Sequence, residues 1–353
     1  MKILLTWLLL MNVAVAQISG GPWGTHSSIT TYSELQLFTP TRPATAAIPY
    51  NGFTWDAEQV DDPCIPDPTA DPIVLLFDGM AAPLQTGPIT IARATATQAA
   101  FASNPQTAWV MDGSNPVLGL GAGGQPDSTY LRVSSCLYNP DDSNKLYLYY
   151  TCNATVDQMC LATSTDTGHT WSRQGVVLNH TIDGCSDETW TSQGAVLRLN
   201  SSSWIMVYSY RTSGATLPGV RYAVSTNGTS WSTGSCTALL NISPLFLEQH
   251  QIMLLGGKCV LVYENGNNST QWTINSASGS SCSSTLTNGA ANPFMTYSGT
   301  ATWDQYHVAT PWLFNVNNKS YLWYQGAADH AQPYGTNHWS MGLAPVNIPT
   351  FRP

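Results

Sequence analysis

The sequence is poor in charged residues. Asp, Glu, Lys and Arg together make up 9% of the 353 residues, and the formal net charge is −9 at pH 7. Because the few basic residues form no cluster, the chain lacks the positive surface that nucleic-acid binding requires, and we expect no such partner. Scarce Lys, Glu and Leu also argue against a helical protein. Runs of β-branched and aromatic residues, separated by Gly, Pro, Asn and Ser, predict an all-β fold.

Long apolar segments are missing after the first 16 residues. Residues 3–15 form an apolar run behind Lys2, and Ala14-Val15-Ala16 has the small-residue pattern that precedes a signal-peptidase site. This run is shorter than the roughly 20 residues that span a bilayer, which disfavours an uncleaved anchor. We therefore expect residues 1–16 to be a signal peptide, and the mature chain to be secreted, extracellular and not attached to a membrane.

The cysteines include no Cys-x-x-Cys pair, which argues against a structural zinc site. Their even count of 8 and the export signal favour four disulfides. The spacing leaves the pairing open, although Cys152 and Cys160 are placed to close a short local loop. Asn-x-Ser/Thr sequons predict surface loops that are glycosylated in a eukaryotic host. They lie at Asn153, Asn179, Asn200, Asn227, Asn241, Asn267, Asn268 and Asn318.

A hairpin unit recurs along the chain. In each copy two short strands flank a polar turn, and the second strand ends in an aromatic residue. The closing aromatics are Phe77, Tyr150, Tyr208, Tyr263 and Tyr324. Period-2 alternation and permissive turn residues are typical of β-hairpins. Five units predict one five-bladed β-propeller with four antiparallel strands per blade. We assign residues 51–353 to this propeller and residues 17–50, which contain several prolines, to an extended N-terminal arm.

Two further segments carry a turn motif. Residues 164–171 read Ser-x-Asp-x-Gly-x-Thr-Trp, which matches the Asp box found in sialidases and other propellers. Residues 225–231 resemble it, with one residue fewer and Asn227 in place of the aspartate. Each motif residue has a turn or packing duty, so the motif predicts the fold rather than a catalytic site.

A second repeat links residues 55–65 with residues 303–313, which share Trp, Asp, Val and Pro at matching positions. Both copies enter the first strand of a hairpin, and in a propeller this innermost strand lines the axis on which a substrate pocket opens. Carboxylates gather at such strand entries, and hydrolysis of a glycosidic bond needs two of them. They are Glu58, Asp61, Asp62, Asp187, Glu188 and Glu248.

With these motifs the chain resembles the five-bladed propeller glycoside hydrolases of the arabinanase, β-xylosidase and arabinofuranosidase superfamily. Residues 60–65 are similar to the motif of the general base, residues 186–190 to that of a pKa-tuning aspartate, and residues 247–252 to that of the general acid. The resemblance implies that Asp62 is the base, Asp187 the tuner and Glu248 the acid of an inverting hydrolysis. Asp61 remains an alternative to Asp62 as the base, and Glu188 remains an alternative to Asp187 as the tuner.

The resemblance also implies an arabinose- or xylose-containing polysaccharide or oligosaccharide as substrate. It places His307 on the axis, near water or a metal ion, with Ca²⁺ as the candidate; no other cofactor is required. We expect a monomer. Indole rings are candidate platforms for sugar rings. The predicted substrate-binding residues are Trp55, Asp61, Glu188, Trp190, His250, Trp303 and His307.

Other interpretations remain open. Asp62 before Pro63 is also a turn signal, and a buried histidine is often structural. A non-catalytic carbohydrate-binding propeller would use the same aromatics without convergent carboxylates. A sialidase-like hydrolase would need an arginine cluster for the sialate carboxylate, and a phosphorylase would need a basic phosphate site. The arginines of the first three predicted blades are scattered: Arg93, Arg132, Arg198, Arg211 and Arg221.

Overall fold

The computed structural model describes residues 40–50, 54–57, 59–81, 87–181, 184–214, 219–240, 246–255, 257–267, 271–290, 292–300, 302–328 and 339–346. For Phe246, Glu248 and Asn267 it describes the backbone alone. The predicted signal peptide and residues 17–39 of the predicted arm lie outside these ranges. Within them one helix occurs, α1 (Gln98–Ser103), and it begins after Thr97, whose side chain accepts a hydrogen bond from the Ala100 amide.

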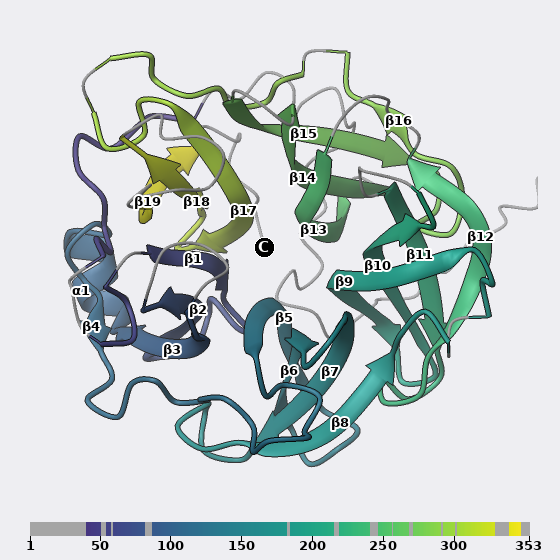
Figure 1. Ribbon diagram of the computed structural model, residues 1–353. Helices are drawn as coiled ribbons and strands as arrows, with labels where there is room; N and C mark the ends of the chain where they lie inside the picture. The colour runs from purple at the N-terminus through teal and green to yellow at the C-terminus, as the bar shows by residue number, and fades with distance from the viewer. Residues whose placement is uncertain are drawn as a thin grey trace, which may run out of the picture.

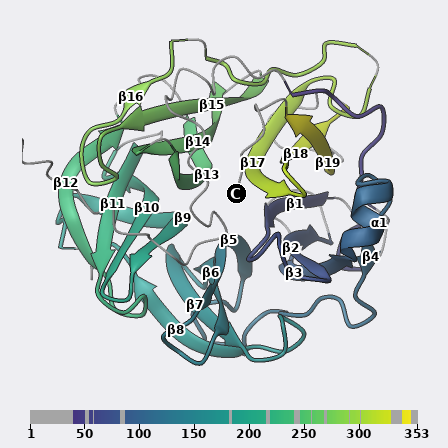
Figure 2. The same cartoon turned by 180° about the vertical axis from the view of Figure 1, so that it is seen from behind.

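The described strands form sheets that surround a central axis (Figures 1 and 2). Three sheets have four antiparallel strands each. The first contains β5 (Tyr130–Asn139), β6 (Lys145–Asn153), β7 (Asp157–Ser164) and β8 (Ser172–Leu178). The second contains β9 (Glu188–Asn200), β10 (Ser203–Thr212), β11 (Gly219–Ser225) and β12 (Ser232–Leu240). The third contains β13 (Phe246–Leu255), β14 (Lys258–Asn267), β15 (Gln271–Gly279) and β16 (Thr287–Asn288).

The fourth sheet has seven strands and joins the two ends of the described chain. Its early part contains β1 (Gln59–Cys64), β2 (Ile73–Met80), β3 (Ile89–Ala96) and β4 (Val110–Met111). Its late part contains β17 (His307–Val316), β18 (Lys319–Ala327) and β19 (Trp339–Val346). A parallel pairing of Gln59 with Trp339 connects the two parts. The all-β prediction and the four-stranded antiparallel sheets are therefore confirmed.

The described end of the predicted arm is paired rather than merely laid over the surface. Pro40 and Ile48 form antiparallel bridges with Val346 and Met341 of β19. Ile48 is fully buried in the same hydrophobic cluster as Met341. Residues 40–48 therefore cover the strand that meets β1.

The innermost strand of each hairpin carries a bulge at the same place. In β1, β5, β9, β13 and β17 the register shifts where the strand passes the closing aromatic of its partner. In four of these strands a non-glycine residue in the bulge has a positive φ angle: Asp62 (52°), Gln193 (51°), Gln249 (26°) and Thr310 (47°). Left-handed backbone at such residues costs energy and must be supported by its surroundings.

A ring of hydrogen bonds supports these bulges. The residue directly after each closing aromatic is polar, buried and reaches the inner strand of the next hairpin around the axis. These bonds run from Val133 N–H to Asp78 Oδ1 at 2.7 Å, Gln193 N–H to Thr151 Oγ1 at 2.8 Å, Ser209 Oγ to the Leu247 carbonyl at 2.9 Å, Thr310 N–H to Glu264 Oε2 at 3.0 Å, and Gln325 Nε2 to Asp61 Oδ2 at 3.3 Å.

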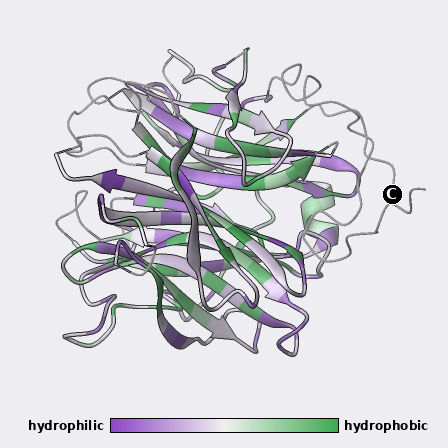
Figure 3. Ribbon diagram, turned by 90° about the vertical axis from the view of Figure 1, so that its right-hand side faces the viewer, coloured by the Kyte–Doolittle hydropathy of each residue, from purple (hydrophilic) through white to green (hydrophobic). Residues whose placement is uncertain are grey.

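Apolar side chains form buried clusters between neighbouring sheets. Hydrophobic and hydrophilic residues both occur along the strands (Figure 3). The Asp-box turns have the predicted structural duties. Asp166 accepts hydrogen bonds from the backbone and side chain of Thr170, and Gly168 has a φ of +88°. In the second copy, the Trp231 indole donates to the carbonyl of Gly228.

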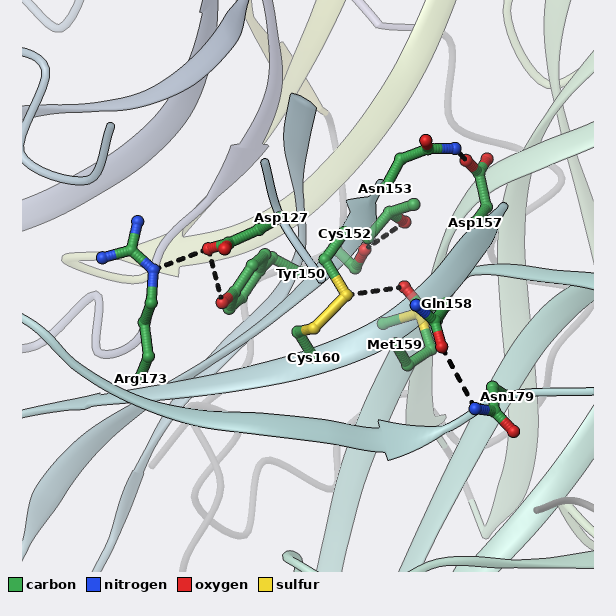
Figure 4. Close-up of a disulfide and its surroundings, with 12 residues drawn as sticks. Asp127, Tyr150, Cys152, Asn153, Asp157, Gln158, Met159, Cys160, Arg173 and Asn179 are labelled. Carbon is green, nitrogen blue, oxygen red and sulfur yellow. Dashed lines mark hydrogen bonds and ion pairs between the residues drawn. A yellow bond between two sulfur atoms is a disulfide. The ribbon is translucent and has the colours of Figure 1, made fainter. Parts of the chain in front are cut away.

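Four disulfides are present, and the predicted Cys152–Cys160 pair is one of them (Figure 4). The others are Cys64–Cys136, Cys185–Cys236 and Cys259–Cys282. Cys64–Cys136 ties β1 to β5, beside the Asp78–Val133 hydrogen bond. The part of the chain that the structure describes has no helix with the length and hydrophobicity of a membrane span.

Candidate functional site at the axis

Three carboxyl groups meet near the axis on the inner hairpin of the seven-stranded sheet. Asp61 and Asp62 lie on β1, and Asp78 lies on β2 opposite Asp61 in the register. A carboxylate oxygen from each lies within 4.8 Å of the others. All three are buried, with exposed fractions of 3%, 3% and 0%. The Arg132 guanidinium, from β5, attracts all three acids electrostatically.

Burial and mutual repulsion change how this cluster ionises. Burial, together with the charges of Asp62 and Asp61, raises the pKa of Asp78 well above its usual range. Burial raises the pKa of Asp61 to about 6, against the opposing effects of Arg132 and Gln325. Burial alone would lower the pKa of Arg132, but the neighbouring aspartates raise it instead. Full ionisation of the three acids beside Arg132 is therefore disfavoured.

A cavity of about 430 Å³ opens beside this cluster, and Arg132 belongs to its wall. The first two four-stranded sheets supply most of the lining, including the bulge residue Gln193. The described lining residues are Ile89, Tyr130, Arg132, Asn153, Thr155, Val156, Asp157, Trp190, Ser192, Gln193 and Arg211. This volume is in the range of small-ligand pockets, and the mixture of one indole, several hydroxyls and amides, and charged groups suits a polyhydroxylated ligand.

One side of the cavity wall is built around Asp157, next to the Cys152–Cys160 disulfide (Figure 4). The Trp190 indole donates a hydrogen bond to Asp157 Oδ2 at 2.7 Å. Tyr130 and Asn153 donate to Oδ1 of the same carboxylate. The Arg211 guanidinium stacks on the Trp190 ring, 4.6 Å from its centre. These contacts fix the orientation of the indole that lines the cavity.

Asp187 and Glu188, predicted as a tuner and its alternative, share one arginine. Arg221 binds both oxygens of Asp187, at 3.0 and 2.8 Å, and also binds Glu188. The two acids differ in burial, because the Asp187 side chain is 51% exposed and that of Glu188 is 0% exposed. The hydrogen bond from Arg221 lowers the pKa of Asp187. Neither acid belongs to the described lining of the cavity.

Glu248, predicted as the acid, lies on β13, and its side chain is outside the described part of the structure. Its backbone pairs with that of Glu264, as Asp61 pairs with Asp78 in the seven-stranded sheet. Two residues on, His250 is buried, and its Nε2 donates to the Val207 carbonyl at 2.7 Å. Burial lowers the pKa of His250 to about 4, so the imidazole is neutral at physiological pH.

His307, predicted near the axis and as a metal ligand, is fully buried at the start of β17. Its ring stacks on Trp339, with 5.2 Å between ring centres. Its partner in the strand register is Ala327. Among the described residues, no set of three His, Cys or acidic groups close enough to hold an ion includes His307. The role of His307 as a metal ligand stays a prediction.

Two of the three predicted indole platforms, both partly buried, pack against a strand glycine. A Cβ built on Gly79 would lie 2.3 Å from the Trp55 ring, and one built on Gly326 would lie 2.5 Å from the Trp303 ring. Both indoles thus lie on a strand glycine two residues after a closing aromatic, which accounts for the sequence repeat. Of the three, Trp190 belongs to the described lining of the cavity.

Sequence reasoning missed Asp78, Arg132 and Gln193 as residues of this region. Arg132 was noted as one of several scattered arginines. For Asp78 the missed signal was that a polar residue directly follows every closing aromatic. Read together, those five positions form the buried ring that surrounds the axis.

Searches against protein-family models and against curated proteins found no match. Solved structures do match. An α-L-arabinofuranosidase from Podospora anserina, in complex with cellotriose, is 16% identical with a TM-score of 0.62, covering 88% of this chain and 96% of that chain. A glycosyl hydrolase from Bacteroides ovatus is 15% identical with a TM-score of 0.64, covering 88% and 93%.

The catalytic domain of a family 62 α-L-arabinofuranosidase from Coprinopsis cinerea is 14% identical, with a TM-score of 0.60 and coverage of 88% of this chain and 96% of that chain. At such identities the likeness concerns the fold and carries no activity with it. The chain has the fold of these glycoside hydrolases over about nine-tenths of its length.

Proposed function

We propose that this chain is a secreted glycoside hydrolase built on a five-bladed β-propeller. The seven-stranded sheet then counts as two blades, β1 to β4 and β17 to β19, joined by the Gln59–Trp339 pairing. The five hydrogen bonds that link successive hairpins around the axis support this count. Four disulfides and the apolar leader at residues 1–16 support export to an oxidising compartment.

One observation carries the catalytic proposal. Asp62 lies in a bulge on the innermost strand, and the guanidinium that acts on it, Arg132, is part of the wall of a sugar-sized cavity. Bulges recur beside active sites, where they direct a side chain. A carboxylate in this position, with a cation nearby that favours its charged form, has the chemistry of a general base.

In the proposed reaction, Asp62 takes a proton from water while the water oxygen attacks the anomeric carbon. The bond from that carbon to the leaving oxygen breaks, and Glu248 gives its proton to this oxygen. Such a reaction inverts the anomeric configuration and needs about 6.5–9.5 Å between the two carboxyl groups. Asp187, ionised beside Arg221, would act through charge and position rather than as a proton donor.

We further propose a polysaccharide or oligosaccharide substrate that contains arabinose or xylose. The cavity volume of about 430 Å³ and the lining indole of Trp190 support a sugar, and two of the solved structures with this fold are named arabinofuranosidases. The proposed reaction requires no cofactor, and a single chain suffices for it. No step of the proposed reaction involves Ca²⁺.

The proposal is tested by sugar release from arabinans, xylans, arabinoxylan and fructans. Wild type is compared with Asp62→Asn and Glu248→Gln, and with Asp142→Asn as a matched control, since Asp142 is a surface residue paired with Lys145. We expect losses of about 10²- to 10⁴-fold in the first two variants, the usual contribution of a general acid or base. Asp142→Asn should match wild type, and proton NMR of the released sugar should show inversion.

Retained polysaccharide binding without release from any substrate would instead support a carbohydrate-binding propeller. The arginines do not favour a sialidase-like site. Arg93 and Arg198 are bound to Asp112 and Asp141, and Arg221 holds Asp187 and Glu188. Of the five scattered arginines, Arg132 and Arg211 belong to the described cavity wall.

A further inference from the structure

Asp78 is a buried acid that the proposed reaction does not use. It lies on β2 directly after Phe77, and its side chain is fully buried. Its Oδ1 accepts the backbone N–H of Val133 at 2.7 Å, which attaches β2 to β5. At the equivalent position of the next hairpin, the neutral Thr151 accepts a backbone N–H in the same way, whereas the fourth hairpin uses the acid Glu264. A neutral group is therefore sufficient for this structural task, so the task alone does not explain the acid at residue 78.

The surroundings of Asp78 decide its protonation. The titratable or charged groups that face it are Asp61 and Asp62 from β1 and Arg132 from β5. Three ionised carboxylates beside one guanidinium would leave two uncompensated negative charges out of contact with water. Carboxylates this close do not all ionise, so at least one keeps its proton.

The hydrogen bonds indicate which carboxyl keeps it. Gln325 donates to Asp61, a contact that favours the charged form of that acid. Asp78 is the most buried of the three, and one of its carboxyl oxygens lies within 4.8 Å of an oxygen of Asp62, whose charge disfavours the ionisation of Asp78. A proton on Asp78 would turn this approach into an O–H donor facing a carboxylate, which is among the stronger hydrogen bonds in proteins.

We propose that Asp78 is a positioning residue, a neutral carboxylic acid that donates its proton in a hydrogen bond to Asp62 and so holds Asp62 as an oriented carboxylate. This inference rests on the proposed function, because it explains how the general base remains ionised inside an acidic cluster. The proton stays on Asp78 during the reaction. Asp62 takes the proton of water through the oxygen that Asp78 does not occupy.

Two substitutions separate this role from a charged or purely structural one. Asn at residue 78 is neutral, keeps an acceptor for Val133 N–H and offers Nδ2–H to Asp62, whereas Leu has a similar size and neither group. We expect kcat/KM to fall at least about tenfold further in Asp78→Leu than in Asp78→Asn, the usual cost of a lost hydrogen bond to a charged group. The acidic limb of the kcat/KM profile should move to higher pH by about one unit in Asp78→Leu alone.

Equal losses in the two variants, with unmoved acidic limbs, would overturn the proposal, as would a larger loss in Asp78→Asn. A second measurement does not depend on activity. In protein labelled with ¹³C at the aspartate carboxyl carbons, one resonance should keep its protonated shift at pH 7 and be absent from Asp78→Asn. Resonances that show all three carboxyl groups ionised would refute the neutral acid. So would carboxyl resonances that move on adding EDTA, because the charge would then be balanced by a metal ion rather than by a proton. If this resonance is present but no sugar is released, the hydrolase proposal fails, whereas the inference that Asp78 is a neutral acid bonded to Asp62 is supported.

Discussion

Gln325 donates a hydrogen bond to Asp61 across 3.3 Å, although 264 residues separate the two in sequence. The contact links β18, in the last hairpin, to β1, the first inner strand. It is the fifth member of a ring in which the residue after each closing aromatic reaches the next inner strand. The same ring supports the bulges at the axis and carries the acids of the candidate site. Stability and function are therefore coupled at these positions.

Thr151→Val tests the ring at a position without a charge. Thr151 Oγ1 accepts the Gln193 N–H at 2.8 Å and also lies 3.1 Å from Ser192 Oγ. Valine keeps the shape but leaves a buried N–H without this acceptor, in a residue that already has a positive φ. We expect a loss of about 1–3 kcal/mol in the free energy of unfolding, measured by urea titration. Thr151→Ser, which keeps the hydroxyl, is the control; similar losses in both variants would argue against the hydrogen bond as the cause.

The disulfides should differ in their contribution to stability. Cys64–Cys136 encloses 72 residues of sequence and Cys152–Cys160 encloses 8. In the chain-entropy account, the longer loop contributes about 4 kcal/mol and the shorter one about 2.5 kcal/mol. Replacing each pair by alanine should therefore lower the free energy of unfolding more for Cys64 and Cys136. Equal effects would show that strain or residual structure outweighs loop length.

The lowered pKa of His250 predicts that the folded protein loses stability in acid. Its pKa is lowered to about 4 in the folded protein, against about 6.5 in an unfolded chain. Between these values the unfolded state binds more protons, so the stability present above pH 6.5 is lost as the pH falls towards 4. We expect wild type to lose about 3 kcal/mol more than His250→Gln between pH 7 and pH 4 in urea titrations. Asp61, whose raised pKa acts in the opposite direction, is present in both proteins and cancels from the difference.

Arg221 should matter far more than Asp187 for stability. Removing the guanidinium in Arg221→Met leaves Glu188, fully buried, without its cation, which typically costs about 3–5 kcal/mol. Asp187→Asn removes a half-exposed partner, and we expect a change of about 1 kcal/mol or less. Thermal unfolding of both variants checks this order. A large loss in Asp187→Asn would mean that the exposed acid organises the buried pair.

Much of the local structure could be read from the sequence. Period-2 alternation, polar turns and closing aromatics located the hairpins around Phe77, Tyr150 and their equivalents, because these signals depend on neighbours within a few residues. The Asp-box turn at Asp166 was readable for the same reason, as was the short Cys152–Cys160 loop. The acids at strand entries, Asp61 and Asp62 among them, were readable in the same way.

The composition of the site could not be read in this way. Alternation says which face a side chain occupies, but the next strand around the axis decides what it meets. The hairpin of β1 and β2 places Asp78 beside Asp61 and Asp62, but only the turn from one sheet to the next brings Asp78 to Val133 and Arg132 to the acids. For the same reason the sequence did not show that Trp55 and Trp303, candidate platforms by type, pack against Gly79 and Gly326. The sequence by itself determined the hairpins and their turns, whereas long-range packing around the axis decided which polar groups share a charge, a proton or a cavity.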